Sequence, residues 1–309
     1  MSNFNYPEGI VRQYAETVQR KVRELAPEIT TELKKVTKIN LGECLILTQT
    51  DEAVSPGLNL TLAFNNGADA GKVAEDFLEA CRHAKENVDA SFFMQGWEQL
   101  KEVIYPCLIS SERNKELARN VVSRPFLDLM VVYKVWQEKE DGLQSVTVTE
   151  DFLQKWGIDE ETLYLQAVNN LKNIDLGIKT YGEYFKEKFS YMFLGADMEE
   201  MNEFLPPLYV WTNRLAMWGA GNMLQLDILK EFWEKHGAGR YLLIIPSSVN
   251  ELMLTPDGLM DAETLRNMVC EVNSGVVTSQ EFLSDNVYIY DGLTGEIEVY
   301  DGVAETATV

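Results

Sequence analysis

Two adjacent serines, Ser247 and Ser248, are the residues of this sequence best suited to act as nucleophiles. A serine nucleophile needs a base within hydrogen-bond reach and donors that stabilise the oxyanion. His236 is the one histidine in this half of the chain, and it lies at the predicted end of a helix, where a basic side chain ordinarily stabilises the helix terminus. The pattern Gly-x-Ser-x-Gly is missing. We therefore favour a turn stabilised by the two hydroxyls over catalysis by Ser247 or Ser248.

Acidic residues cluster in the sequence just after these serines. Two carboxylates held together could bind a divalent cation or share acid–base work, and Glu251 is a weak catalytic candidate on this ground. Their spacing is irregular, however, and acidic residues are common in the first turn of a helix, as Asp261 and Glu263 would be. A solvated acidic face is the simpler interpretation. The cluster consists of Glu251, Asp257, Asp261, Glu263 and Glu271.

Other motifs that could hold a cofactor or a metal ion are weak. Gly219-Ala220-Gly221 precedes a helix and could bind an anion, but no Lys-Ser or Lys-Thr follows, so close helix packing is the better interpretation. The two histidines and four cysteines lack metal or redox spacing, and we interpret the cysteines as buried thiols. We therefore expect no cofactor and no metal.

The charge of the chain restricts its partners. The net charge is −22, and the residues from Tyr241 onward contribute −11 of it, with twelve acidic side chains against one basic. Such a surface repels phosphates, so direct nucleic-acid binding is disfavoured. Solubility is the simplest explanation, and a basic protein partner or mimicry of nucleic acid are the functional alternatives. The sequence contains no run of 18 apolar residues, so we expect no membrane-spanning helix.

The serines and the carboxylates lie between predicted elements. Tyr241–Ile245 is a continuous apolar run typical of a strand buried on both faces, and Glu251–Thr255 is expected to pair with it. Pro246-Ser247-Ser248 should interrupt the first strand. Elsewhere the patterns predict helices at Glu8–Leu25 and Lys115–Val122, and strands at Leu58–Phe64 and Phe126–Trp136.

This order of elements predicts an α+β fold with mixed sheets. We expect an N-terminal helix-and-sheet domain at 1–94 and an α+β domain at 95–309. Glu161-Thr162-Leu163 is echoed by Glu263-Thr264-Leu265, which raises the hypothesis that a strand–helix–strand–strand–helix unit is duplicated in 95–173 and 208–309. One irregular α+β domain is the alternative.

An aromatic helical insert is expected at 174–207. Core packing is the default interpretation of an aromatic stripe on one helix face, and a partner-docking surface is the functional one. The candidate partner-binding residues are Tyr181, Tyr184, Phe185 and Phe189.

Four stretches carry a resemblance to a known family: VSPGLNL at 54–60, YVWTNRLAMWGAGNML at 209–224, YLLIIPSSVNEL at 241–252 and MVCEVNSGVVTSQEFLSDNVYIYD at 268–291. The chain resembles an uncharacterised family of clostridial gut bacteria, a domain of unknown function. A more distant similarity, through IYPCLIS and the helix ending AVNNL, is to a shorter uncharacterised Bacillus family. Val249-Asn250 stands where the resemblance leads us to expect Ile-His, which argues against histidine-based chemistry there. The resemblance implies no activity.

Together these observations favour a cytosolic, non-enzymatic binding or regulatory protein that acts through its acidic C-terminal surface. The beginning of the chain has no basic start followed by an apolar block, which is why we expect a cytoplasmic location. One alternative is a hydrolase that uses Ser247, Ser248 or the Glu251–Glu271 carboxylates. The other is an inhibitor that mimics nucleic acid.

Overall fold

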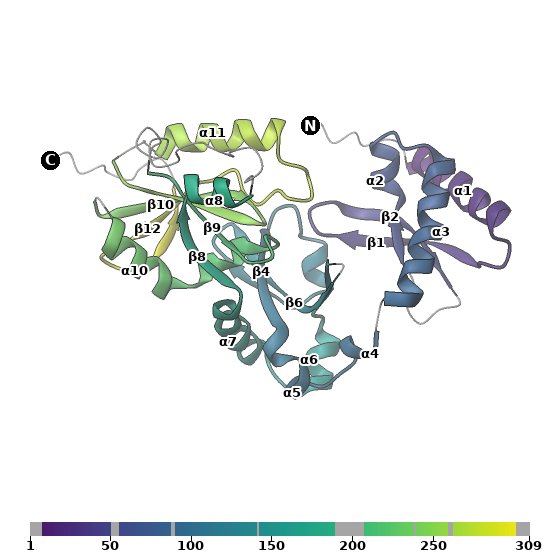
Figure 1. Ribbon diagram of the computed structural model, residues 1–309, viewed down its shortest axis with the longest axis horizontal. Helices are drawn as coiled ribbons and strands as arrows, with labels where there is room; N and C mark the ends of the chain where they lie inside the picture. The colour runs from purple at the N-terminus through teal and green to yellow at the C-terminus, as the bar shows by residue number, and fades with distance from the viewer. Residues whose placement is uncertain are drawn as a thin grey trace. The chain divides into compact units, whose positions relative to one another are not determined.

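The computed structural model describes residues 8–50, 56–87, 90–140, 142–188, 207–237, 239–258 and 262–300. The chain forms two compact units, Met1–Gly96 and Trp97–Val309 (Figure 1). Each unit combines helices with a β-sheet in which the described strands pair antiparallel. The fold is therefore α+β, as the order of predicted elements indicated.

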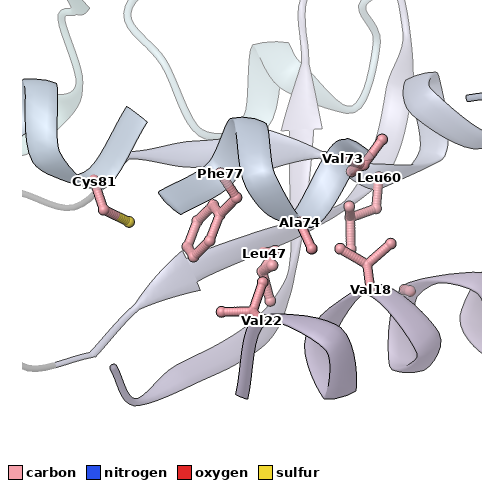
Figure 2. Packing of buried hydrophobic residues seen from close by; sticks show 9 residues of the cluster. Val18, Val22, Leu47, Leu60, Val73, Ala74, Phe77 and Cys81 are labelled. Carbon is pink, nitrogen blue, oxygen red and sulfur yellow. The ribbon is translucent and has the colours of Figure 1, made fainter. Parts of the chain in front are cut away.

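The first unit packs helices on a three-stranded sheet in the order β1-β2-β3. Apolar residues of two helices meet the sheet in one core, where Val18 and Val22 face Phe77 and Leu47 (Figure 2). The periodic helix predicted at Glu8–Leu25 is confirmed. The elements are α1 (Glu8–Leu25), β1 (Thr31–Lys38), β2 (Gly42–Gln49), β3 (Gly57–Asn59), α2 (Leu60–Asn65), α3 (Ala70–Asn87) and α4 (Ala90–Phe93).

The strand predicted at Leu58–Phe64 is wrong for most of its length. Only Gly57–Asn59 pairs with β2, and the helix α2 begins at Leu60. The side chain of Asn59 accepts a hydrogen bond from the Leu62 amide at 3.0 Å. An asparagine in this N-cap position satisfies a free amide of the first turn, so it starts a helix where hydrophobicity alone favoured a strand.

The second unit begins with a sheet around the long strand β6, which is buried between β4 on one side and β5 and β7 on the other. The strand predicted at Phe126–Trp136 is confirmed from Leu129 onward, but Phe126 belongs to the preceding strand and pairs with Leu129 across a two-residue turn. The helix predicted at Lys115–Val122 is reduced to a short 3-10 turn. The elements are α5 (Trp97–Leu100), η1 (Lys101–Val103), β4 (Ile104–Ser110), η2 (Leu117–Arg119), β5 (Ser123–Phe126), β6 (Leu129–Lys139), β7 (Gly142–Thr147), α6 (Glu150–Trp156), α7 (Glu160–Asn170) and η3 (Leu171–Asn173).

A six-stranded sheet follows, in the order β13-β12-β10-β11-β9-β8. Leu265 and Val269 of α11 pack on Leu243 and Ile245, and α10 lies on the other face, where Phe232 contacts Tyr209 (Figure 1). The elements are β8 (Asp175–Thr180), α8 (Tyr181–Lys188), β9 (Tyr209–Asn213), η5 (Gly219–Leu224), α10 (Leu226–His236), β10 (Tyr241–Ser248), β11 (Glu251–Pro256), α11 (Ala262–Gly275), β12 (Tyr288–Asp291) and β13 (Ile297–Val299).

Three expectations for this sheet are changed or left open. The segment 174–207 is not helical throughout, because its first residues form the edge strand β8. The strand β10 continues through Pro246 to Ser248 instead of ending at Ile245. The duplication stays a prediction: β4 pairs with the long strand β6, whereas β9 pairs with β11.

The glycines of the Gly219-Ala220-Gly221 motif serve close packing, as predicted. A β-carbon at Gly219 would lie 2.3 Å from the Asn250 carbonyl oxygen, and one at Gly221 would lie 2.5 Å from the Pro106 carbonyl oxygen. All residues of η5 are buried. The motif therefore lets η5 lie directly against the backbone of both sheets.

The cysteines of the chain are free thiols. Cys44, Cys81 and Cys107 are buried as predicted, whereas the prediction is wrong for Cys270, which is exposed on α11. Burial raises the pKa of the Cys107 thiol to about 12, so this group stays protonated and unreactive. Within the described residues no helix is long and apolar enough to cross a membrane.

Candidate functional site

The turn between β10 and β11 carries the serines that the sequence singled out. Ile245 pairs with Met253 and Ser248 pairs with Glu251, so Pro246 and Ser247 together lie opposite the single residue Leu252. Two residues opposite one residue form a β-bulge. A proline is tolerated in a bulge because the backbone N–H that it lacks is not needed there for a hydrogen bond between the strands. Ser247 follows Ile245 by two residues and Glu251 precedes Met253 by two, so the side chains of Ser247 and Glu251 lie on the same side of the sheet.

The helix α8 reaches this turn from the edge strand β8, which β9 separates from β11 in the sheet. It begins directly after the edge strand β8, and a reciprocal capping box fixes its start: the Thr180 amide donates to Glu183 at 2.9 Å and the Glu183 amide donates to the Thr180 hydroxyl at 3.2 Å. The Thr180 hydroxyl also donates to Glu183, which lowers the pKa of that carboxyl. The first turn of α8 is thereby fixed, with Tyr184 in the following turn.

A chain of hydrogen bonds connects these two elements. The Tyr184 hydroxyl donates to Glu251 Oε2 at 2.7 Å, and the Ser247 hydroxyl donates to Glu251 Oε1 at 3.3 Å. The Lys188 ammonium group donates to the Tyr184 oxygen at 2.9 Å. We call Lys188, Tyr184, Glu251 and Ser247 the Tyr184 cluster. Both carboxylate oxygens of Glu251 are therefore engaged by hydroxyl groups.

The charges of the Tyr184 cluster are set by burial and by its neighbours. Burial raises the pKa of the Tyr184 phenol; the Lys188 ammonium group opposes this effect and Glu251 adds to it. The hydrogen bond to Tyr184 raises the pKa of Lys188, and the negative charges of Glu251 and Glu281 contribute in the same direction. Near neutral pH the phenol is thus protonated and the amine is charged.

This geometry does not assemble an activated serine. The bond from Ser247 to Glu251, at 3.3 Å, is longer than the 2.7–2.8 Å typical of a hydroxyl–carboxylate bond. Ser248 is engaged differently, because its oxygen accepts the Asn250 amide at 3.0 Å within the turn. The imidazole of His236 stacks on Phe232 and lies 3.4 Å from the Tyr209 hydroxyl. The partners of His236 are therefore aromatic residues of α10 and β9.

Asn250, which replaces the histidine expected from the resemblance, anchors the turn. Its side-chain oxygen accepts the Trp218 amide at 3.1 Å, and its carbonyl oxygen accepts the Thr212 hydroxyl at 2.7 Å. The neighbouring Val249 amide donates to the Glu281 carbonyl oxygen at 2.9 Å. These bonds hold the end of the hairpin against η5, β9 and the segment before β12.

The other predicted site residues are separated or only partly brought together. Glu263 and Glu271 are exposed on α11, and at 1.5 Å per residue they lie about 12 Å apart along its axis. Tyr181 and Phe185 stack with ring centroids 5.7 Å apart and are half-buried. Phe189 and Asp261 lie outside the described residues. In the described part of the chain, no three His, Cys, Asp or Glu side chains are grouped so that they could hold a metal ion.

Sequence reasoning missed one member of the cluster and the element that positions it. Lys188 follows Tyr184 by four residues, a spacing that makes two side chains neighbours on a helix. The motif Thr180-Tyr181-Gly182-Glu183 matches the capping-box pattern and could have located the start of α8. Neither signal, however, predicts that Tyr184 meets Glu251, 67 residues further along the chain.

Comparison with known proteins gives one family. A family model described as a family of unknown function, DUF5688, matches residues 11–292. No curated protein matches the chain. No solved structure matches it either.

Proposed function

The chain belongs to the DUF5688 family of unknown function, and from its own charges and hydrogen bonds we propose that it is a non-enzymatic binding or regulatory protein with a basic partner. The acidic surface of the last third of the chain is the binding surface in this proposal. One observation carries it: all but one of the described carboxylates of that surface lie outside ion-pair distance of a basic side chain.

The uncompensated carboxylates are exposed side chains on α11 and around β13. Asp291 pairs with Arg240 at 2.5 Å. Among the described residues from 241 to 300, no other acidic side chain lies within ion-pair distance of a basic one. A surface of this kind attracts cationic partners, and the attraction weakens as salt screens it. The exposed glutamates among these carboxylates are Glu263, Glu271, Glu296 and Glu298.

Binding of a basic peptide measures this attraction directly. We expect a fluorescent, N-acetylated octalysine peptide to bind at an ionic strength of about 0.01 M and to be released at about 1 M, because the Debye length falls from about 30 Å to about 3 Å. Replacing the four exposed glutamates with glutamine should weaken binding about tenfold at low salt, because each exposed charge contributes a few tenths of a kcal/mol. Fluorescence anisotropy gives both results.

The matched control neutralises four exposed carboxylates of the first unit. Both variants change the net charge from −22 to −18, so they differ only in where the charge is removed. Equal weakening by the two variants, or binding that salt leaves unchanged, would contradict the proposal. The control residues are Glu24, Glu28, Glu75 and Glu79.

A hydrolase centred on Ser247 is the second candidate function, and the hydrogen bond from Ser247 to Glu251 is the observation that favours it. The length of that bond argues against it, because a serine nucleophile requires a base that takes its proton. We expect a fluorophosphonate probe to leave Ser247 unmodified. Labelling that Ser247→Ala abolishes, detected by mass spectrometry, would support the hydrolase and refute a purely binding role.

We also propose a cytoplasmic location and a clostridial origin. Four free thiols and no disulfide support a reducing compartment. The stretches of sequence that resemble the clostridial family support the origin, and IYPCLIS supports the distant relation to a Bacillus family. Cell fractionation with an antibody against the protein tests the location.

A further inference from the structure

The ammonium group of Lys188 lies in a setting that suits a cation of a partner protein. Its nitrogen is 2.9 Å from the Tyr184 hydroxyl oxygen and 5.1 Å from the centre of the Tyr184 ring. The face of an aromatic ring attracts an ammonium or guanidinium group, and a carboxylate beside the ring adds a charge of opposite sign. Here Glu251 provides that carboxylate, hydrogen-bonded to the same tyrosine at 2.7 Å.

The ammonium group of Lys188 is influenced by one carboxylate of the Tyr184 cluster and by one carboxylate outside it. Glu251 and Glu281 both act electrostatically on Lys188. Glu281 is held beside the turn by two bonds: its carbonyl oxygen accepts the Val249 amide, and its side chain accepts the Thr278 hydroxyl at 2.8 Å. Both carboxylates thus act on one ammonium group, and neither is within ion-pair distance of a basic side chain among the described residues.

Lys188 itself is weakly held. Its side chain is on the exposed last turn of α8, and its hydrogen bond to the Tyr184 hydroxyl contributes little because water competes for it. Tyr184 and Glu251, by contrast, are half-buried and fixed to two different elements. The site is therefore preformed, while the cation within it is replaceable.

We propose that Tyr184, Glu251 and Glu281 form a binding site for a lysine or arginine side chain of the basic partner, and that Lys188 occupies this site in the free protein as a competing internal cation. This inference rests on the proposed function and adds to it a specific contact and a source of self-inhibition. Ser247, bonded to the same carboxylate, helps to orient Glu251 toward the incoming cation.

The test compares two lysine variants in octalysine binding. Lys188→Met empties the site and should tighten binding about threefold at low salt, because the internal cation that competes for the site is removed. Lys230→Met is the matched control: Lys230 is exposed on α10 and pairs with Glu234 at 4.0 Å, so this variant also lowers the net charge by one unit and frees one carboxylate. Lys230→Met should have a smaller effect.

Two further variants identify the contact. Glu251→Gln removes the carboxylate and should reverse the gain when combined with Lys188→Met. Tyr184→Phe keeps the ring but loses the hydroxyl that orients Glu251, and it should reverse only part of the gain. Equal affinities of the Lys188→Met and Lys230→Met variants, with salt-sensitive binding by the wild type, would overturn this inference and leave the proposed function standing. No binding by any variant would overturn both.

Discussion

The variant Gly221→Ala should lower the free energy of unfolding of the Trp97–Val309 unit by about 3 kcal/mol, through overpacking. A β-carbon at this position would lie 2.5 Å from the Pro106 carbonyl oxygen, which belongs to the backbone of the fully buried strand β4. Backbone cannot move aside as the end of a flexible side chain can. The added methyl group must therefore push η5 away from the sheet.

Urea denaturation followed by tryptophan fluorescence measures this loss specifically. All six tryptophans of the chain lie in the Trp97–Val309 unit, so the signal reports on that unit alone. Gly275→Ala is the control, because a β-carbon at Gly275, the last residue of α11, would have no neighbour within 4 Å. The control should be neutral or slightly stabilising. Similar losses in the two variants would show that close packing of η5 is not the cause.

The variant Asp128→Ala should cost the same unit about 3 kcal/mol or more, because it leaves several donors without an acceptor. Asp128 lies in the two-residue turn between β5 and β6. Its carboxylate accepts the Ser284 and Tyr288 hydroxyls, each at 2.7 Å, and the Asn286 amide at 3.0 Å. Tyr288 and Ser284 are 0% and 3% exposed, so water cannot replace the lost acceptor.

A double-mutant cycle with Tyr288→Phe separates the contribution of the Tyr288–Asp128 hydrogen bond from the rest of the stability that Asp128→Ala loses. Burial is the main cause that raises the pKa of Tyr288, and the negative charge of Asp128 adds to it, so the phenol stays protonated and donates to the carboxylate. Tyr288→Phe should cost about 1 kcal/mol in the wild type and less when Asp128 is already alanine. Asp227→Ala is the surface control, since Asp227 is exposed and lies 3.7 Å from Lys172. An Asp128→Ala loss no larger than the control would refute this role for the carboxylate.

Local sequence patterns predicted the elements whose cause is local. The helix at Glu8–Leu25 follows from apolar residues at three- and four-residue steps, and the strand at Tyr241–Ile245 follows from a continuous apolar run. The glycines before α10 were also interpreted correctly. In each case the residues that determine the structure lie within the same helix, strand or turn, so a local sequence pattern is sufficient to predict it.

Two predicted strands were wrong in part, because polar contacts outweighed the hydrophobicity of the sequence. Asn59 starts α2 with one side-chain hydrogen bond, inside a run that reads as a strand. The hairpin at Leu127-Asp128 interrupts an apolar run, and its turn residue Leu127 has a φ of 57°. The residues that donate hydrogen bonds to Asp128 lie 156 to 160 residues further along the sequence, so no local sequence pattern predicts this turn.

The sequence by itself determined the α+β class, the pairing of β10 with β11, and the excess of carboxylates after residue 240, because composition and periodicity carry that information. It also singled out Ser247, Glu251 and Tyr184 by residue type. Only the tertiary structure brought those three together with Lys188. Local geometry positions each side chain on its own strand or helix, but their meeting depends on the order of the strands in the six-stranded sheet. That order brings the helix after the edge strand β8 to the end of the central β10–β11 hairpin.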